Sequence, residues 1–166
     1  MIAGDAVVHE LVLPAPPAEI FDMFVEAEKL VTWIGISAEL EARPDGGFRF
    51  ELMPGQYCEG RYVIIEPPHR VVFTWGWSDP SMGVPPGSST VEVTFEPQAA
   101  GSGTLLRLVH RGLPDTDRER LLHDDGWTRF LARLQAVVAG EQAPAYPTEQ
   151  PGERLEQLRE GATEES

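Results

Sequence analysis

Apolar and polar side chains alternate along much of the chain, which is the pattern of strands that bury one face. Residues 5–13 alternate in this way and are followed by prolines at 14, 16 and 17, which stop a strand. The next apolar side chains recur at helical spacing, and Pro17 suits a first helical turn. The pattern predicts a strand at 5–13, a short helix at 17–26 and a second short turn that carries Leu30 and Trp33.

The central part of the chain returns to strand alternation and is interrupted by turns that contain proline and glycine. Residues 44–47 and 54–55 form turns of the kind that join antiparallel neighbours. Six strands are predicted there, at 36–43, 48–53, 57–66, 70–77, 90–96 and 104–111. With the first strand, the expected total is seven.

A long helix is predicted after this meander of strands. From residue 115 the apolar side chains recur at helical spacing as far as Gly140, a residue type that often ends helices. A helix with one apolar face can bury it only against the concave side of the sheet. The expected fold class is α+β, with a curved antiparallel sheet wrapped around a long C-terminal helix and two short helices after the first strand.

Large aromatic side chains recur at every second position on the strand faces that should turn inward. Aromatic rings can line a gap between sheet and helix without filling it as branched aliphatic side chains would. We therefore predict a ligand cavity between sheet and helix. Its expected lining is Trp33, Phe48, Phe50, Tyr62, Phe73, Trp75, Trp77, Phe95, Leu106, Leu108, His110, His123, Trp127, Phe130 and Leu131.

The charge balance argues against two classes of partner. The chain has 27 acidic and 13 basic side chains and a formal net charge of -14. This charge repels phosphate backbones and anionic lipid headgroups, so neither nucleic acid nor a membrane surface is an expected partner. Because no stretch reaches the roughly 20 apolar residues that cross a bilayer, and the opening residues do not resemble a signal peptide, we expect a cytoplasmic protein.

The domain organisation follows from a change of composition near residue 140. Residues 141–166 are rich in glutamate and proline, so we expect one domain at 1–140 and an acidic, flexible tail at 141–166. The single cysteine, Cys58, has no basic neighbour in sequence and is expected to be a buried, inert thiol.

Five segments in order carry a family resemblance: APPAEIFDMFVEAEKLVTWIG, GGFRFELMPGQYCEGRYVIIEPPHRVVFTW, STVEVTFEP, GTLLRLVHRGLP and HDDGWTRFLARL. Together, over about residues 5–140, they resemble the START-like (SRPBCC) superfamily, and within it the family of the activator of the heat-shock protein 90 ATPase. The resemblance implies the helix-grip fold of Bet v-type proteins and a cavity for a small, mostly apolar molecule. We expect a bacterial member of this family, as a monomer or homodimer.

His110 is a weak catalytic candidate. Strand alternation directs it toward the cavity mouth, where a histidine could act as acid or base. We favour a structural role, because the sequence fixes no nucleophile or paired carboxylate near it. His110, His123, Asp124 and Asp125 match no established ligand spacing, so neither a metal nor another cofactor is expected.

Two other segments allow a structural or a functional interpretation. Gly126 is interpreted as a point where the helix closely approaches the sheet, with Trp127 on the cavity floor. Residues 78–89 form a long loop rich in glycine and proline, which is either a gate to the cavity or an insertion without a role.

Three functions remain open at this point. The leading hypothesis is a protein that binds or carries a small hydrophobic or aromatic ligand, lipids included, and does not convert it. The second is a cyclase or hydrolase in which His110, with Tyr62 or Glu59, moves protons on a polyketide-like substrate. The third is a protein that interacts with a chaperone or regulator. The superfamily includes carriers as well as enzymes, so the fold does not decide among them.

Overall fold

The computed structural model describes residues 1–99, 103–145 and 151–164. Its elements are β1 (Ile2–Ala3), β2 (Ala6–Leu13), α1 (Pro17–Val25), α2 (Ala27–Leu30), β3 (Ser37–Leu40), β4 (Gly47–Met53), β5 (Gln56–Glu66), β6 (Arg70–Trp75), the 3-10 turn η1 (Pro80–Met82), β7 (Ser89–Pro97), β8 (Thr104–Arg111), α3 (Asp117–Val138) and α4 (Pro151–Glu164).

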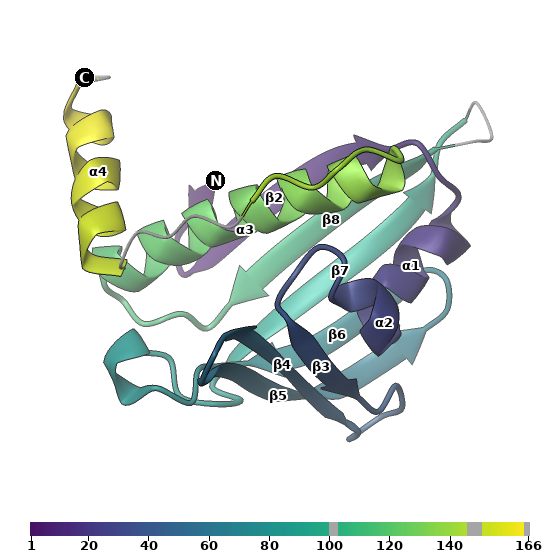
Figure 1. The fold of residues 1–166 in the computed structure, drawn as a ribbon, viewed down its shortest axis with the longest axis horizontal. Coiled ribbons are helices and arrows are strands. Elements are labelled where there is room, and N and C mark those ends of the chain that lie inside the picture. The colour runs from purple at the N-terminus through teal and green to yellow at the C-terminus, as the bar shows by residue number, and fades with distance from the viewer. Residues whose placement is uncertain (100–102, 146–150, 165–166) are drawn as a thin grey trace.

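The strands form one curved antiparallel sheet in the order β1-β2-β8-β7-β6-β5-β4-β3. Figure 1 shows α3 running lengthwise beside β2 and β8, while α1 and α2 lie farther along the sheet. The predicted α+β helix-grip fold, with its two short helices after the first long strand, is confirmed. None of the described helices combines the length and apolar content needed to cross a bilayer.

Two details of the predicted strands are wrong. The described sheet has eight strands rather than seven, because residues 2–3 pair with β2 as the short strand β1. Two residues are too few to show an alternation. The sixth strand, β6, ends at Trp75 instead of residue 77, and Trp77 forms only an isolated bridge with Cys58.

Gly76 explains why β6 ends where it does. A Cβ atom at this position would lie 1.8 Å from the backbone oxygen of Pro85, so only glycine lets the two segments approach this closely. The amide of Trp77 donates to the carbonyl of Val84 at 2.7 Å, and Val84 is buried. The loop that follows is also fastened to β5, because the amides of Ser78 and Gly87 donate to the carbonyls of Tyr57 and Glu59 at 2.9 and 3.2 Å.

The core lies between the concave face of the sheet and the helices. Inward positions alternate along each strand, as in β7, where Val91, Val93 and Phe95 are buried and the residues between them are not. Helix α1 covers one end of this face, and Phe21 and Phe24 pack edge-to-face on Phe95 at centroid distances of 5.6 and 5.5 Å. Helix α3 covers the side of the face formed by β2 and β8 (Figure 1).

The tail contains the helix α4, which packs against α3 near the other end of the sheet (Figure 1). Leu155 of α4 is buried, and the Arg154 guanidinium binds both carboxylate oxygens of Asp125 at 2.9 and 2.6 Å. Helix α4 therefore contributes both an apolar and a charged contact to the body of the protein.

Candidate ligand-binding site

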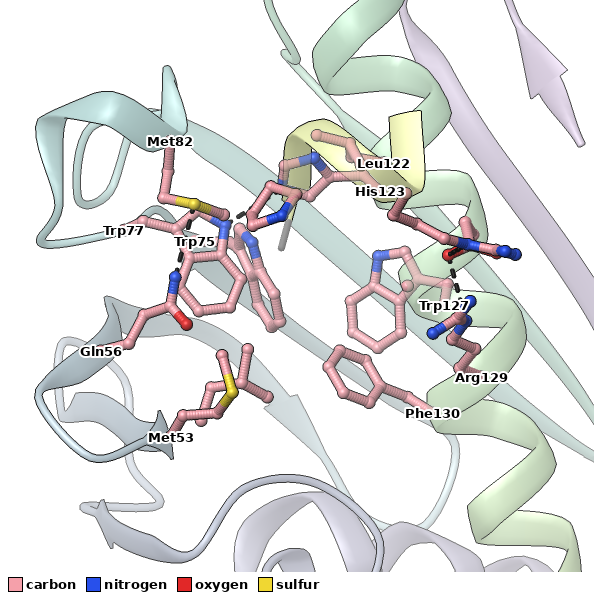
Figure 2. A pocket seen from close by; sticks show the side chains of 15 residues that line it. Met53, Gln56, Trp75, Trp77, Met82, Leu122, His123, Trp127, Arg129 and Phe130 are labelled. Carbon is pink, nitrogen blue, oxygen red and sulfur yellow. Dashed lines mark hydrogen bonds and ion pairs between the residues drawn. The ribbon is translucent and has the colours of Figure 1, made fainter. Parts of the chain in front are cut away.

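A pocket opens at the end of the sheet where the β4–β5 turn, the η1 segment, the first half of α3 and the start of α4 meet. Its volume is about 170 Å³. Figure 2 shows the side chains that line it, which are Leu52, Met53, Gln56, Trp75, Trp77, Met82, Leu122, His123, Asp125, Gly126, Trp127, Arg129, Phe130, Pro151 and Arg154.

Aromatic rings form two opposite sides of this pocket. Trp75 and Trp77 come from the sheet, and they face Trp127 and Phe130 of α3 (Figure 2). The two sides meet at the base, where the rings of Trp75 and Trp127 lie 5.0 Å apart between centroids. Trp127 also contacts Phe130 edge-to-face at 5.8 Å. The pocket is thus bordered by two aromatic surfaces, which contact each other through Trp75 and Trp127.

His110 lies behind the floor of the pocket and is completely buried. The indole N–H of Trp127 donates to its Nδ1 at 3.0 Å, so the proton of the neutral ring belongs on Nε2. Nε2 lies 2.8 Å from Ser89 Oγ, and that hydroxyl donates to the backbone oxygen of Trp75 at 2.9 Å. The chain of hydrogen bonds therefore fixes the tautomer of His110 and engages both ring nitrogens.

His123 repeats this arrangement with the opposite tautomer. Its Nδ1 lies 2.7 Å from the backbone oxygen of Glu119, one turn earlier in α3, and must carry the proton to bond with it. Its Nε2 accepts the indole N–H of Trp77 at 3.2 Å. The two imidazole rings meet edge-to-face, 5.3 Å apart between centroids. Two tryptophan–histidine pairs thus stand side by side at the inner end of the pocket.

Both pairs require neutral histidines. A protonated ring carries N–H groups on both nitrogens, so it would place a donor against the indole N–H in each pair. Burial lowers the pKa of His110 well below its usual 6.5, and the neighbouring His123 lowers it further. Burial also lowers the pKa of His123, although its bond to Glu119 acts in the opposite direction. Neither ring is set up to exchange protons with a ligand.

The rim of the pocket is charged. Asp125 binds Arg129, one helical turn later, at 3.1 Å and Arg154 of α4 through both carboxylate oxygens. Pro151 stands beside Arg154 in the pocket wall. The tail and the long helix therefore close this side of the pocket together through an ion pair.

Residues 14–139 match the family described as Activator of Hsp90 ATPase homolog 1-like protein. The chain belongs to this family. An AHSA1-like protein from Rhizobium etli, whose structure was solved in solution, is 36% identical, with a TM-score of 0.66 over 87% of this chain and 88% of that one. The family resemblance found in the sequence is thereby confirmed.

More distant relatives share the fold. DynU16, from the dynemicin biosynthetic locus, has a TM-score of 0.71 at 21% identity and covers 85% of this chain and 50% of its own. The Aha1 dimer from Colwellia psychrerythraea has a TM-score of 0.69 at 16% identity, covering 80% of this chain and 95% of its own.

A curated relative, an uncharacterized protein of Schizosaccharomyces pombe, is 29% identical over 105 residues. These residues are 63% of this chain and 29% of the relative, so the chain spans under a third of that protein's length.

The residues that were predicted to line the cavity fall into two groups in the structure. Trp75, Trp77, His123, Trp127 and Phe130 line the pocket. The others belong to the surrounding core, outside the pocket wall, and are Trp33, Phe48, Phe50, Tyr62, Phe73, Phe95, Leu106, Leu108, His110 and Leu131.

The contacts of the second group explain why so many residues that were predicted to line the cavity lie in the packed core instead. Phe48 stacks on Phe73 at a centroid distance of 4.2 Å. The hydroxyl of Tyr62 donates to the backbone oxygen of Phe24 at 2.8 Å, and burial raises its pKa. The aromatic residues at this end of the sheet therefore pack on one another, which confines the open space to the end near Trp75.

Sequence reasoning missed most of the pocket's rim and mouth. Leu52 and Met53 both line the pocket although they are neighbours in β4, because the register with β5 shifts between Glu51 and Met53. Met82 comes from the 78–89 loop, which was considered as a gate. The clearest available signal was that loop's length, and nothing in the local pattern indicates the contribution of α4.

Gly126 corrects one interpretation. It was expected to mark a close approach between α3 and the sheet, but a Cβ atom there would meet nothing within 4 Å, and the residue lines the pocket. The indoles of Trp75 and Trp127 lie between the helix and the sheet at this level and keep them apart. Gly126 therefore faces open space in the pocket wall.

The remaining polar candidates have structural partners. Glu59 pairs with Arg49 on the sheet surface at 3.7 Å. Cys58 is buried, as expected, and burial raises the pKa of its thiol well above the usual value. Asp124 pairs with the Met1 amino group and His9 rather than with His123. Among the described residues, no group of three or more histidine, cysteine or acidic side chains is placed to hold a metal ion.

Proposed function

We propose that the protein binds a small, mostly apolar aromatic molecule in this pocket and releases it unchanged. The observation that carries the proposal is the pair of facing aromatic surfaces, Trp75 and Trp77 on one side and Trp127 and Phe130 on the other. Flat apolar ligands gain both from leaving water and from stacking on such rings. The acidic surface of the chain and the apolar interior of the pocket favour a neutral ligand over an anionic one.

The state of the histidines supports binding over catalysis. A general acid or base needs a ring nitrogen within reach of the ligand and a pKa near the working pH. In His110 and His123 all four ring nitrogens are already within hydrogen-bond distance of protein groups, and the pKa of each ring is lowered. A cyclase or hydrolase mechanism through His110 would first have to break the bond to Trp127.

Thermal unfolding in the presence of toluene, indole and naphthalene tests the proposal. A molecule that fills the pocket should stabilise the fold by about 2.7 kcal/mol at a hundredfold excess over its Kd. For a chain of this length that amounts to roughly 5–11 °C in Tm. Tryptophan fluorescence should change with the same Kd, because three indoles line the pocket.

Chromatography of the ligand after incubation completes this test. Unchanged ligand agrees with the proposal, whereas a product that the His110→Gln variant does not form would replace it with an enzymatic function. If none of the aromatic probes shifts Tm or fluorescence, the protein does not bind small aromatics here.

A substitution that places a larger side chain in the pocket provides a second test of the proposal. Gly126→Leu places a side chain in the open space of the pocket and is expected to weaken binding of toluene more than tenfold. The same variant should not lose stability, because glycine in a helix interior is about 0.8–1 kcal/mol less favourable than alanine, and leucine ranks next to alanine. Gly126→Ala is the control: it should gain similar helix stability and keep most of the binding. A destabilised Gly126→Leu protein would show that the helix does pack closely at this point.

A further inference from the structure

One buried hydrogen-bond donor in the pocket differs from its counterparts elsewhere in the protein. Trp33, Trp77 and Trp127 each donate the indole N–H to a protein atom, at 3.0, 3.2 and 3.0 Å. Trp75 is only 1% exposed, yet its Nε1 has no hydrogen-bond partner among the described residues. Buried indole N–H groups are normally paired, so this donor requires an explanation.

A buried acceptor lines the same pocket. The Nε2 amide group of Gln56 donates to the sulfur of Met82 at 3.4 Å. The remaining polar atom of this side chain is the acceptor Oε1. Oε1 is buried and has no partner among the described residues. Gln56 enters the pocket from the start of β5, beside Met82 (Figure 2). Two residues that line the apolar pocket, Trp75 and Gln56, therefore each carry a buried polar atom, one a donor and one an acceptor, that no described protein group pairs.

From these two atoms we infer that the ligand is a phenol, that is, a single aromatic ring bearing at least one hydroxyl group. This inference rests on the proposed function and adds the polar group by which the site selects its ligand. A cavity of about 150 Å³ is enough for benzene, and this pocket has a volume of about 170 Å³. The ring occupies the pocket between the aromatic surfaces, and the hydroxyl meets the unpaired protein atoms.

The hydroxyl group follows from the hydrogen-bonding needs of the two atoms. Trp75 requires an acceptor and Gln56 requires a donor. A carboxylate or ether can only accept, and an ammonium can only donate, whereas a hydroxyl does both. A single hydroxyl can accept from Trp75 and donate to Gln56, and a ring with two hydroxyls can serve the two atoms separately. Hydroxylated rings thus satisfy the pocket in a way that a plain hydrocarbon does not.

Binding of p-cresol and toluene, measured by titration calorimetry on the full chain, tests this inference. The two molecules share ring and methyl group and differ by one hydroxyl. We expect p-cresol to bind at least about tenfold more tightly, which corresponds to about 1.4 kcal/mol. The ether p-methylanisole, which can accept but not donate, should bind less tightly than p-cresol.

Two variants assign the preference to the two atoms. Trp75→Phe keeps an aromatic ring but removes the N–H, and it should reduce the preference for p-cresol over toluene to less than about threefold. Gln56→Met removes the acceptor, so it should weaken the binding of p-cresol and leave the binding of p-methylanisole unchanged. Trp33→Phe is the matched control, because Trp33 donates to the backbone of Met23 outside the pocket wall. Its preference for p-cresol should equal that of the unmodified protein.

The outcomes separate this inference from the proposed function. If toluene binds and p-cresol binds no better, the protein binds aromatics but does not select phenols, and the inference is overturned. Full preference for p-cresol in both Trp75→Phe and Gln56→Met would overturn it as well. If neither molecule binds, the proposed function itself fails.

Discussion

Replacing Trp127 with alanine is expected to lower the free energy of unfolding by about 3–5 kcal/mol, the range for removing a large aromatic side chain from a core. Trp127 is 2% exposed and contacts both Trp75 and Phe130. Its loss would also leave Nδ1 of His110 without its donor in a buried site. Urea unfolding followed by circular dichroism at pH 7.5 measures the effect.

Trp127→Phe separates packing from hydrogen bonding in this prediction. Phenylalanine keeps most of the ring contacts but cannot donate to His110, so the expected loss is about 1–3 kcal/mol. It should therefore be clearly smaller than the loss in Trp127→Ala. A change below about 1 kcal/mol in the alanine variant would contradict the placement of Trp127 between helix and sheet.

Stability is expected to fall steeply as the pH drops below about 6.5. The pKa values of His110 and His123 are lowered in the folded protein, chiefly by burial, so the unfolded chain binds protons that the folded one does not. Each such histidine lowers the free energy of unfolding by up to about 1.4 kcal/mol per pH unit, until the pH reaches its folded-state pKa. Above pH 7 both states are neutral at these positions and the contribution is constant.

Other titrating groups modify this pH dependence in known directions. The pKa of His9 is lowered by burial and by the Met1 amino group, against the opposing effect of Asp124, so His9 adds to the slope. Burial raises the pKa of Glu119 on α3, but its bonds to Thr116 and Arg118 outweigh this and bring it below 4.5. That carboxylate therefore loses its contribution only at lower pH, outside the interval from 5 to 7.

Urea unfolding at half-unit steps between pH 5 and 7.5 checks this prediction. His110→Gln should reduce the slope below pH 6.5 by up to about 1.4 kcal/mol per pH unit, whatever its stability at neutral pH. His69→Gln, in an exposed turn, is the control and should leave the slope unchanged. A flat profile down to pH 5 in the unmodified protein would show that the buried rings are protonated in the fold.

The sheet and its inward face could be predicted because the information is local. In β6, Val71, Phe73 and Trp75 turn inward because successive side chains of a strand point to opposite faces. The long helix was equally readable, since its apolar stripe recurs every three or four residues. The family resemblance and the fold followed from the order of these elements.

The shape of the pocket could not be predicted, because it depends on pairings between distant segments. The bond from Trp77 to His123 joins residues 46 positions apart, and nothing in either segment indicates the other. The shift in register after Glu51 breaks the alternation that strand prediction assumes, so Leu52 and Met53 both reach the pocket. Which aromatic rings pack together and which border open space is likewise decided by the tertiary fit.

The wall contributed by α4 has a consequence for comparing this protein with its relatives. The family match ends at residue 139, whereas Pro151 and Arg154 border the pocket. A relative without a counterpart of α4 would therefore share the sheet and the long helix and still present a differently bounded pocket. Residues beyond the family match thus help to shape the pocket of this protein, whereas strands β3 to β8 and the long helix lie within the match.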